Sequence, residues 1–262
     1  MHEFGNFLVS LPVWGQALVF MSITLVAGEL IARVTQRLAR GLDLGRELTV
    51  TVAVYTVVGT TYGILLSFAV SLVWGENSGA ATAVSNEAQA LSQLHRSAGF
   101  TLAQPYAGEA QALARNYAQA VVEREWPELR RHEFTHTSRD AANRLADFAG
   151  QIPQTAAANP ASYMLFQGHV TRWLEARQQR LTAGITDLPR PMWGALMLGA
   201  LVLFSFHGAL VTQTSRARYL LLVPLAMIIG VQLCMVFTLD RPYAGAFAVD
   251  PQPFIDFIDA MR

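Results

Sequence analysis

Four long runs of apolar residues constrain most strongly what this chain can fold into. They cover residues 10–30, 52–74, 192–212 and 219–239. Each is about 20 residues long, the length that an α-helix needs to cross the hydrocarbon core of a bilayer. Across all four runs, Glu29 is the one residue among Asp, Glu, Lys and Arg. We therefore expect an all-α integral membrane protein with four transmembrane helices.

Two other interpretations of these runs fit less well. A soluble protein would have to bury four helices of spanning length in a small core. A cleaved signal peptide would require a basic segment before the first run and an A-x-A-type cleavage site after it. Residues 1–8 contain no Lys or Arg, and no such site follows. We expect the first run to remain as a membrane helix.

Charge and cysteine content exclude several classes of protein. The 262 residues include 19 basic and 19 acidic side chains, so the formal net charge is zero. A nucleic-acid-binding protein usually carries a basic patch or stripe, so no nucleic-acid partner is expected. The single cysteine, Cys234, excludes an intrachain disulfide and a four-cysteine zinc site.

The residues between the second and third runs are patterned as helices outside the membrane. Apolar side chains recur every three or four positions from Tyr106 to Val121, which places them on one helix face. No strong helix breaker follows the second run, so that helix is expected to continue to about Ala98. The expected parts are a first transmembrane pair (1–74), a helical extramembrane domain (75–190), a second transmembrane pair (191–239) and a tail (240–262).

Local signals within the extramembrane domain and the tail give further expectations. Ser138 is a candidate N-cap for a short helix, and residues 151–160 are expected to form a loop. The last extramembrane helix is expected to run toward Pro189 and Pro191, which would end it. The tail is expected to fold back and to dock Phe254, Phe257 and Ile258 on the extramembrane helices.

Arginine placement suggests an orientation. The connection at residues 32–47 holds four arginines, and the turn after the third run holds Arg216 and Arg218. Short arginine-rich loops stay in the cytoplasm, so the extramembrane domain and both termini are predicted to lie outside. Four arginines near the third run favour the opposite orientation: Arg172, Arg177, Arg180 and Arg190.

Small residues form a continuous face along the second run. Gly59, Gly63, Ser67 and Ser71 recur every four residues, and the hydroxyls of Thr56 and Thr60 lie near them. Small faces let membrane helices approach closely. The face either packs against another helix of the same chain or lines a pore around a symmetry axis.

Two ionisable residues lie within the runs. An ion pair between Glu29 and Arg33, one helical turn later, explains Glu29 without a functional role, although intramembrane ionisable residues often mark functional sites. His207 is expected to bond to a neighbouring helix, with titration near neutral pH as the alternative.

One short motif matches a zinc-binding pattern. His132, Glu133 and His136 form H-E-x-x-H, which on a helix can bind zinc through its two histidines. The motif lies in a strongly charged stretch, lacks flanking apolar residues and has no evident third ligand. We interpret it as an exposed polar segment, so His132 and His136 are weak metal candidates and no catalytic residue is predicted.

Three segments carry motifs that belong together: Tyr62-Gly63 through Trp74 to Glu87-Ala88 and Leu91; Tyr117, Val121 and Glu125-Trp126-Pro127; and Leu239 to Tyr243, Gly245 and Pro253-Phe254. Together these segments resemble the bacterial bestrophin-like membrane proteins. The resemblance extends from about Thr49 to Met261, and its most specific part is Asp240-Arg241-Pro242. An aromatic–proline neck motif and an acidic calcium clasp are absent.

The resemblance implies an ion channel that assembles as a homo-oligomer and whose large helical domain lies in the cytoplasm. The expected function is an ion-conducting pore lined by the second transmembrane helix. The alternatives are a non-conducting sensor, scaffold or partner subunit and, more remotely, a zinc-dependent hydrolase. We expect a multi-pass protein of the bacterial inner membrane with no cofactor, whose partners are the lipid bilayer, further copies of itself and inorganic ions.

Overall fold

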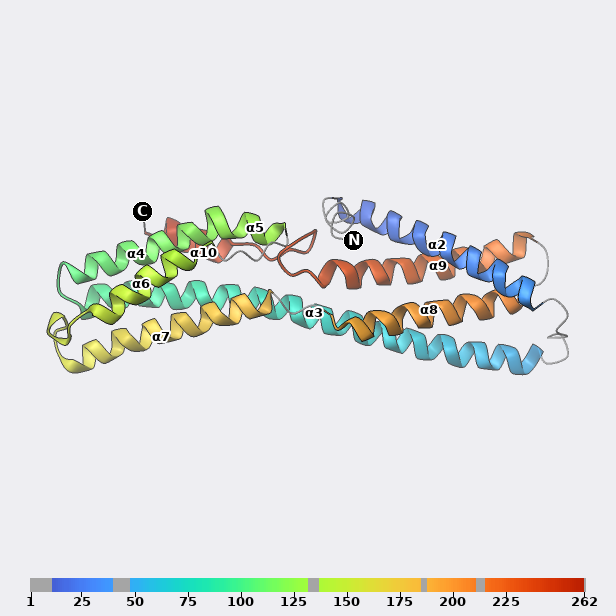
Figure 1. Cartoon of the computed structure of the whole chain (residues 1–262), viewed down its shortest axis with the longest axis horizontal. Coiled ribbons are helices and arrows are strands. Elements are labelled where there is room, and N and C mark those ends of the chain that lie inside the picture. The colour runs from blue at the N-terminus through green and yellow to red at the C-terminus, as the bar shows by residue number, and fades with distance from the viewer. Residues whose placement is uncertain (1–10, 40–47, 132–136, 185–187, 211–214, 262) are drawn as a thin grey trace. The chain divides into compact units, whose positions relative to one another are not determined.

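A computed structural model of the chain describes residues 11–39, 48–131, 137–184, 188–210 and 215–261. Every named element among these residues is a helix, and their one β contact is an isolated bridge between Leu102 and Ala157 (Figure 1). The chain divides into two compact units. Met1–Gly75 with Asp187–Asp240 forms a membrane unit, and Glu76–Thr186 with Arg241–Arg262 forms an extramembrane unit.

The membrane unit contains the four expected transmembrane helices. They are α2 (Val13–Leu38), the first part of α3 (Leu48–Thr101), α8 (Arg190–Leu210) and α9 (Ser215–Leu239). All four are long and apolar enough to cross a bilayer. The expectation of an all-α, four-span membrane protein is therefore confirmed. The connection expected to start at Ala32 is instead helical as far as Leu38.

Close helix contacts at glycines hold the membrane unit together. Gly28 of α2 lies against the ring of Phe204 in α8, and Gly208 of α8 lies against the backbone of Ala32 in α2. Thr24 in α2 donates a hydrogen bond of 2.9 Å to the carbonyl oxygen of Ala226 in α9. Membrane helices associate through such small-residue contacts and interhelical hydrogen bonds because lipid supplies no hydrophobic driving force between them.

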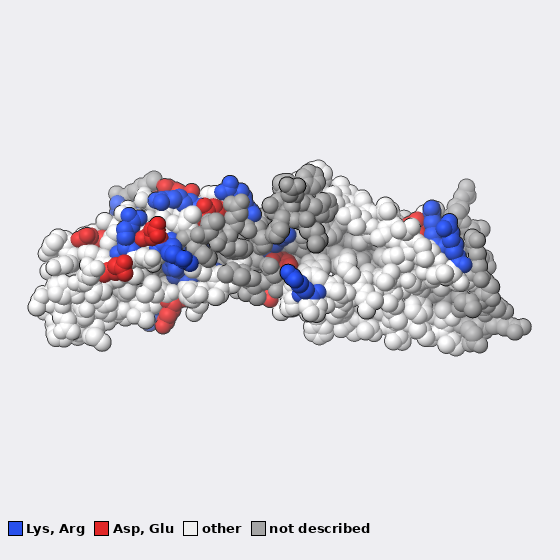
Figure 2. All heavy atoms as spheres, viewed as in Figure 1, with Lys and Arg blue, Asp and Glu red and all other residues white. Residues whose placement is uncertain are grey.

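The two units differ in the polarity of their surfaces, as expected for one unit in lipid and one in water. Figure 2 shows one face, on which charged side chains gather over the extramembrane helices and are few over the membrane helices. Large apolar side chains of the membrane unit are exposed, among them Trp14 (70%), Val26 (69%) and Leu220 (75%). Exposed apolar area on this scale marks contact with a membrane or another protein. The membrane unit therefore contacts lipid.

The extramembrane unit is a helical bundle with its own apolar core. It combines the second part of α3 with α4 (Tyr106–Ala120), the π-helix η1 (Val121–Glu125), α5 (Trp126–Arg130), α6 (Arg139–Gln151), the short 3₁₀-helix η2 (Gln154–Ala156), α7 (Pro160–Ala183) and α10 (Gln252–Asp259). The largest apolar side chains of its core are fully or almost fully buried: Tyr117, Trp126, Phe166, Trp173 and Phe254.

Several local expectations can now be compared with the structure. The helix expected to reach Ala98 ends at Thr101, and the tail docks as expected, with Phe254 and Phe257 buried in the extramembrane core. The expectation that Pro189 and Pro191 end the last extramembrane helix is wrong. That helix ends at Ala183 with Gly184 as its C-cap, and Pro191 lies in the first turn of α8, where proline is tolerated.

Ser138 and the expected loop at 151–160 differ in detail from the expectation. Ser138 does precede α6, but its side chain makes no cap hydrogen bond to the helix. The hydroxyl instead donates to the carboxylate of Glu125. Within the expected loop, residues Gln154–Ala156 form the single 3₁₀ turn η2.

Candidate functional site

The small face of α3 is largely open in the single chain. Thr56, Thr60, Ser67 and Ser71 are exposed. A Cβ atom added at Gly63 would meet no heavy atom of the described chain within 4 Å. A neighbouring side of the same helix is buried against the other membrane helices, through Tyr62, Leu66, Ala69 and Val73. Intrachain packing therefore uses the apolar side of α3 and leaves most of the small face free.

Gly59 is the member of the small face that lies near another helix. A Cβ atom at this position would be 3.6 Å from the Cδ1 atom of Leu203 in α8, an ordinary van der Waals contact. The two threonine hydroxyls of the face donate hydrogen bonds to carbonyl oxygens of α3 itself. Thr56 donates to the carbonyl oxygen of Val52 and Thr60 to that of Thr56, each at 2.9 Å. The exposed oxygens can still accept hydrogen bonds, which makes the face weakly polar.

Glu29 takes part in a larger ion-pair cluster than the sequence indicated. Its Oε1 atom lies 2.6 Å from Nε of Arg33, the predicted pair, and 2.8 Å from Nη2 of Arg218 in α9. Arg218 also donates to Oε1 of Gln36 at 3.1 Å. The carboxylate therefore ties the end of α2 to the start of α9, which accounts for an acidic residue in this span.

His207 is buried in α8, with 4% of its surface exposed. Its Nε2 atom has no hydrogen-bond partner among the described residues. The neighbouring Gly208 lies directly against Ala32 of α2. The imidazole interacts with the backbone of Arg218 in α9, a neighbouring helix, although its Nε2 atom is unpaired among the described residues.

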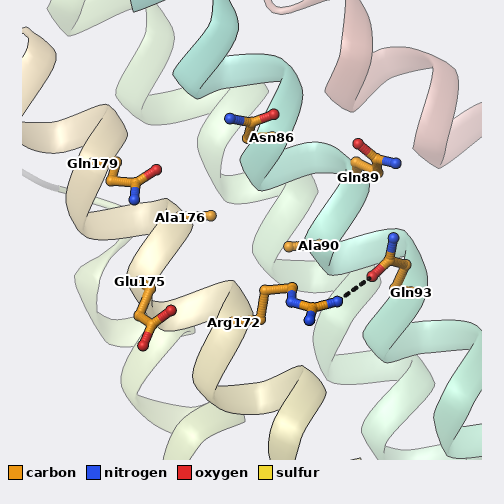
Figure 3. Close-up of a pocket in the computed structure, with 8 residues that line it drawn as sticks. All are labelled: Asn86, Gln89, Ala90, Gln93, Arg172, Glu175, Ala176 and Gln179. Carbon is orange, nitrogen blue, oxygen red and sulfur yellow. Dashed lines mark hydrogen bonds between the residues drawn. The ribbon is translucent and has the colours of Figure 1, made fainter.

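A polar groove runs between α3 and α7 in the extramembrane unit. Its volume is about 330 Å³, and amide side chains of α3 face Arg172 and Glu175 of α7 across it (Figure 3). Arg172 and Gln93 connect the two walls through a hydrogen bond of 3.5 Å. A wider groove of about 600 Å³ adjoins it, shares Asn86 and Gln179, and extends along α3 to Glu76. The narrower groove therefore gives this part of the extramembrane α3 a hydrophilic side.

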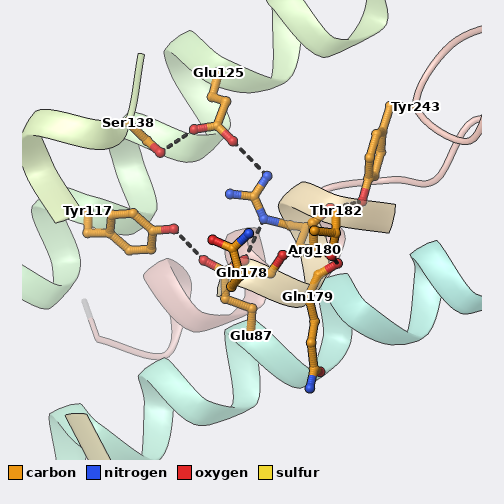
Figure 4. A network of polar contacts seen from close by, with 9 residues as sticks. All are labelled: Glu87, Tyr117, Glu125, Ser138, Gln178, Gln179, Arg180, Thr182 and Tyr243. Atoms are coloured by element: carbon orange, nitrogen blue, oxygen red, sulfur yellow. Dashed lines mark hydrogen bonds and ion pairs between the residues drawn. The ribbon is translucent and has the colours of Figure 1, made fainter. Parts of the chain in front are cut away.

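A buried charge network forms the centre of the extramembrane unit (Figure 4). The guanidinium of Arg180 in α7 pairs with Glu87 of α3 through Nε at 2.5 Å and with Glu125 of η1 through Nη1 at 2.7 Å. All three side chains are at most 1% exposed. Tyr117 donates a hydrogen bond to Glu87, and Ser138 donates one to Glu125.

The electrostatics of this network favour the charged forms of Glu125 and Arg180. Burial alone would raise the pKa of Glu125, but the Arg180 guanidinium and the Ser138 hydroxyl outweigh burial and hold the pKa below its usual value. Burial alone would lower the pKa of Arg180, and the two carboxylates raise it well above the usual value. Burial raises the pKa of Tyr243 to about 12. Glu125 and Arg180 therefore form a charged pair at neutral pH.

Four residues of the motifs that carry the resemblance, Trp126, Asp240, Arg241 and Pro242, lie near the buried charge network or at the end of α9. Trp126 is buried against Tyr243, with ring centroids 5.5 Å apart. The Tyr243 hydroxyl donates to the backbone oxygen of Arg180 at 3.1 Å. Asp240 accepts a hydrogen bond of 2.6 Å from the backbone N–H of Leu188, ahead of α8. These contacts give the motif a structural role.

Arg241 and Pro242 follow directly after the end of α9. Pro242 is buried, and its carbonyl oxygen accepts a hydrogen bond of 2.7 Å from Val249, which closes a turn in the tail. Gly245 within this turn has a φ of 90°, a left-handed conformation that side chains with a Cβ rarely adopt. The turn directs the chain toward α10.

The sequence patterns did not identify Arg180 as a site residue. The resemblance named Glu87, Tyr117, Glu125 and Tyr243 one by one, without the partner that joins them. Arg180 is separated from Glu87 by 93 positions and from Glu125 by 55. The one clue in the sequence is that Glu87 and Glu125 are acidic residues of the motifs, and neither Glu87-Ala88 nor Glu125-Trp126-Pro127 includes a basic residue to neutralise the charge.

The metal-binding candidates lie outside the described residues. His132, Glu133 and His136 all fall in the range 132–136. Within the described part of the chain, no group of three or more His, Cys, Asp or Glu side chains is arranged to hold a metal ion.

The fold and these sites define an all-α, four-span membrane protein with a helical extramembrane domain and an open small face on its second span. The family model for the Bestrophin-like domain matches residues 22–254. The chain therefore belongs to the Bestrophin-like family, as the sequence motifs indicated. This is not a family of enzymes, in agreement with the expectation of no catalytic role.

Solved structures support the same fold. Two variants of a bacterial bestrophin homologue from Klebsiella pneumoniae match with TM-scores of 0.65 and 0.66 at 13% identity. One match covers 92% of this chain and 96% of the homologue, and the other covers 93% and 98%. At this identity the likeness concerns the fold alone. A comparison with curated proteins finds no match.

Proposed function

We propose that this protein assembles as a homo-oligomer around α3 and conducts inorganic ions along the small face of that helix. The observation that carries the proposal is the exposure of Thr56, Thr60, Ser67 and Ser71 in the single chain. Hydroxyl oxygens facing lipid would lose hydrogen bonds to water, which is unfavourable. The same oxygens facing an axis would line a narrow, weakly polar path.

The exposed side of α3 also carries apolar residues that a neighbouring subunit can cover. Ile64 is 54% exposed and Phe68 is 68% exposed, next to the hydroxyl face. Outside the membrane, the same helix carries Asn86, Gln89 and Gln93 along the polar groove. Uncharged amides and hydroxyls solvate ions without holding them tightly, and conduction requires weak binding of this kind.

The proposal places the protein in the inner membrane of a bacterium, with lipid around the oligomer and inorganic ions as the transported species. No step of ion conduction requires a cofactor. Family membership and the exposed apolar surface of the membrane unit support this placement.

Current measurements on the purified protein in planar bilayers test the proposal. We expect single-channel currents from the wild type and a strong reduction in Ser67→Trp, because an indole on the small face would obstruct the path. Ile228→Trp is the matched control, since Ile228 lies on α9 and is 59% exposed. Currents no larger than those of an empty bilayer, or equal currents in both variants, would contradict the proposal.

The same preparation separates the remaining alternatives. A stable oligomer that carries no current would favour the non-conducting sensor, scaffold or partner subunit. Stoichiometric zinc that is lost in a His132→Ala variant would favour the zinc-dependent hydrolase. We expect no such metal, because the motif lacks a third ligand in the sequence.

A further inference from the structure

A second groove opens between α2 and α9 in the membrane unit. Its volume is about 310 Å³. Four of its lining residues are apolar: Leu25, Val26 and Leu30 from α2, and Val223 from α9. The other three are polar or charged: Glu29, Arg33 and Tyr219. The groove therefore combines a hydrocarbon wall with a charged rim.

The polarity of the groove changes along its length in a definite direction. On α2, Leu25 and Val26 precede Glu29 by about one turn, and Arg33 follows Glu29 by one turn. On α9, Tyr219 lies near the start of the helix and Val223 follows one turn later. Because α2 ends and α9 begins at this side of the membrane unit, the charged rim faces the membrane surface and the apolar wall faces the interior.

The charged groups at and beside the rim sum to a positive charge. Glu29 and Arg33 line the groove and pair with each other. Arg218 does not line the groove but pairs with the same carboxylate, so the three groups together carry one positive charge. Arg218 is held in place by Gln36 and by the backbone oxygen of Glu29. The Arg33 side chain pairs with Glu29 through Nε but remains 57% exposed, which leaves the outer edge of its guanidinium accessible from the membrane surface.

We propose that this groove binds an anionic phospholipid of the surrounding bilayer. The phosphate pairs with the guanidinium of Arg33, which presents donors in a geometry that matches phosphate oxygens. Tyr219 lies at headgroup depth, where tyrosine is enriched in membrane proteins. One acyl chain lies along Leu25, Val26 and Val223. The occupant is a lipid because only an amphiphile matches both the charged rim and the apolar wall in this order.

Native mass spectrometry of the full chain, purified in detergent, tests the lipid site. Phosphatidylglycerol and phosphatidylcholine with the same acyl chains are added separately. We expect the wild type to retain phosphatidylglycerol preferentially. Arg33→Gln should bind it about tenfold more weakly, the effect of losing one charge-assisted hydrogen bond. Arg37→Gln is the matched control, because Arg37 is exposed on the same helix and does not line the groove.

A second variant tests the apolar wall independently of the charges. Val223→Trp fills the groove and should also weaken phosphatidylglycerol binding, while thermal melting confirms that the variant is folded. Equal retention of both lipids, or unchanged binding in both groove variants, would overturn the proposal. Glycerol phosphate binding as tightly as the lipid would also overturn it. So would a lower oligomeric mass in Val223→Trp without loss of lipid, because a second copy would then occupy the groove.

Discussion

At Arg180 a buried guanidinium compensates two carboxylates that come from different helices. Removing water from charged groups is costly. The attraction between the buried charges offsets this cost only while every partner is present. The pairs at 2.5 and 2.7 Å and the hydrogen bonds from Tyr117 and Ser138 satisfy the carboxylate oxygens. The network therefore makes the extramembrane unit sensitive to the loss of a single member.

Arg180→Met should destabilise the protein by about 3–5 kcal/mol, because Glu87 and Glu125 would remain buried without a cation. Thermal melting in detergent, followed by near-ultraviolet circular dichroism, measures this loss. Arg172→Met is the control, since Arg172 is exposed and makes one long hydrogen bond to Gln93. Adding Glu87→Gln and Glu125→Gln to Arg180→Met should restore part of the loss. Equal melting temperatures for the Arg180 and Arg172 variants would contradict this account.

The lowered pKa of Glu125 predicts how stability depends on pH. A carboxyl group with a lowered pKa in the folded state stabilises that state above its unfolded pKa of about 4.3. This contribution is lost as pH falls through the folded value. The wild type should therefore lose melting temperature more steeply between about pH 5 and about pH 3 than Glu125→Gln. Parallel melting curves over this range would show that Glu125 is not the titrating group.

Among the elements, α2 and α8 approach so closely that one contact tolerates only glycine. A Cβ atom at Gly208 would lie 2.5 Å from the backbone oxygen of Ala32. Gly208→Ala should therefore force the two helices apart and destabilise the protein by about 1–3 kcal/mol. Gly194→Ala on the same helix is the control, because its added Cβ meets nothing within 4 Å of the described chain.

Melting of both glycine variants in detergent measures the effect. The Gly194 variant should match or slightly exceed the wild type, since alanine favours the helix more than glycine does. A Gly208 variant as stable as the Gly194 variant would mean that the α2–α8 contact adjusts without loss.

The π-helix η1 shows where a helical pattern stops being predictive. From Tyr106 to Val121, the apolar spacing correctly predicts one buried face of α4. The wider turn at η1 then shifts the register, and both Glu125 and Trp126 become buried. The α-helical spacing of apolar residues does not predict this change of register. Tertiary contacts of Glu125 with Arg180 and of Trp126 with Tyr243 stabilise the π-helix.

At the scale of the whole molecule, the sequence predicts those features of the fold that depend on residues close together in the chain. Each span could be recognised because a bilayer requires about 20 apolar residues in succession, and the long α3 followed from the absence of a strong breaker. The charge network depends on residues far apart in the chain. From the sequence, Arg180 is one of four arginines near the third span that bear on the orientation in the membrane. In the structure it is buried and paired with Glu87. Its role could not follow from its neighbours in the sequence.

The homo-oligomer remains a prediction at the scale of the assembly, and its geometry can be tested with single cysteines. In a ring with α3 facing the axis, Ser71 of each subunit would face the same residue in the others. A disulfide requires Cα atoms within about 7 Å. In a Cys234→Ser background, which removes the one native thiol, Ser71→Cys should form intersubunit disulfides under mild oxidation in membranes.

Ile228→Cys is the matched control for cross-linking, because this exposed residue lies on α9 and would face lipid at the outside of the ring. Non-reducing electrophoresis should show a dimer band for Ser71→Cys that disappears on reduction, and none for Ile228→Cys. The opposite pattern would place α9 at the subunit contact. The hydroxyls of α3 would then lie away from the axis, and the proposed conduction path would be wrong even if the protein is oligomeric.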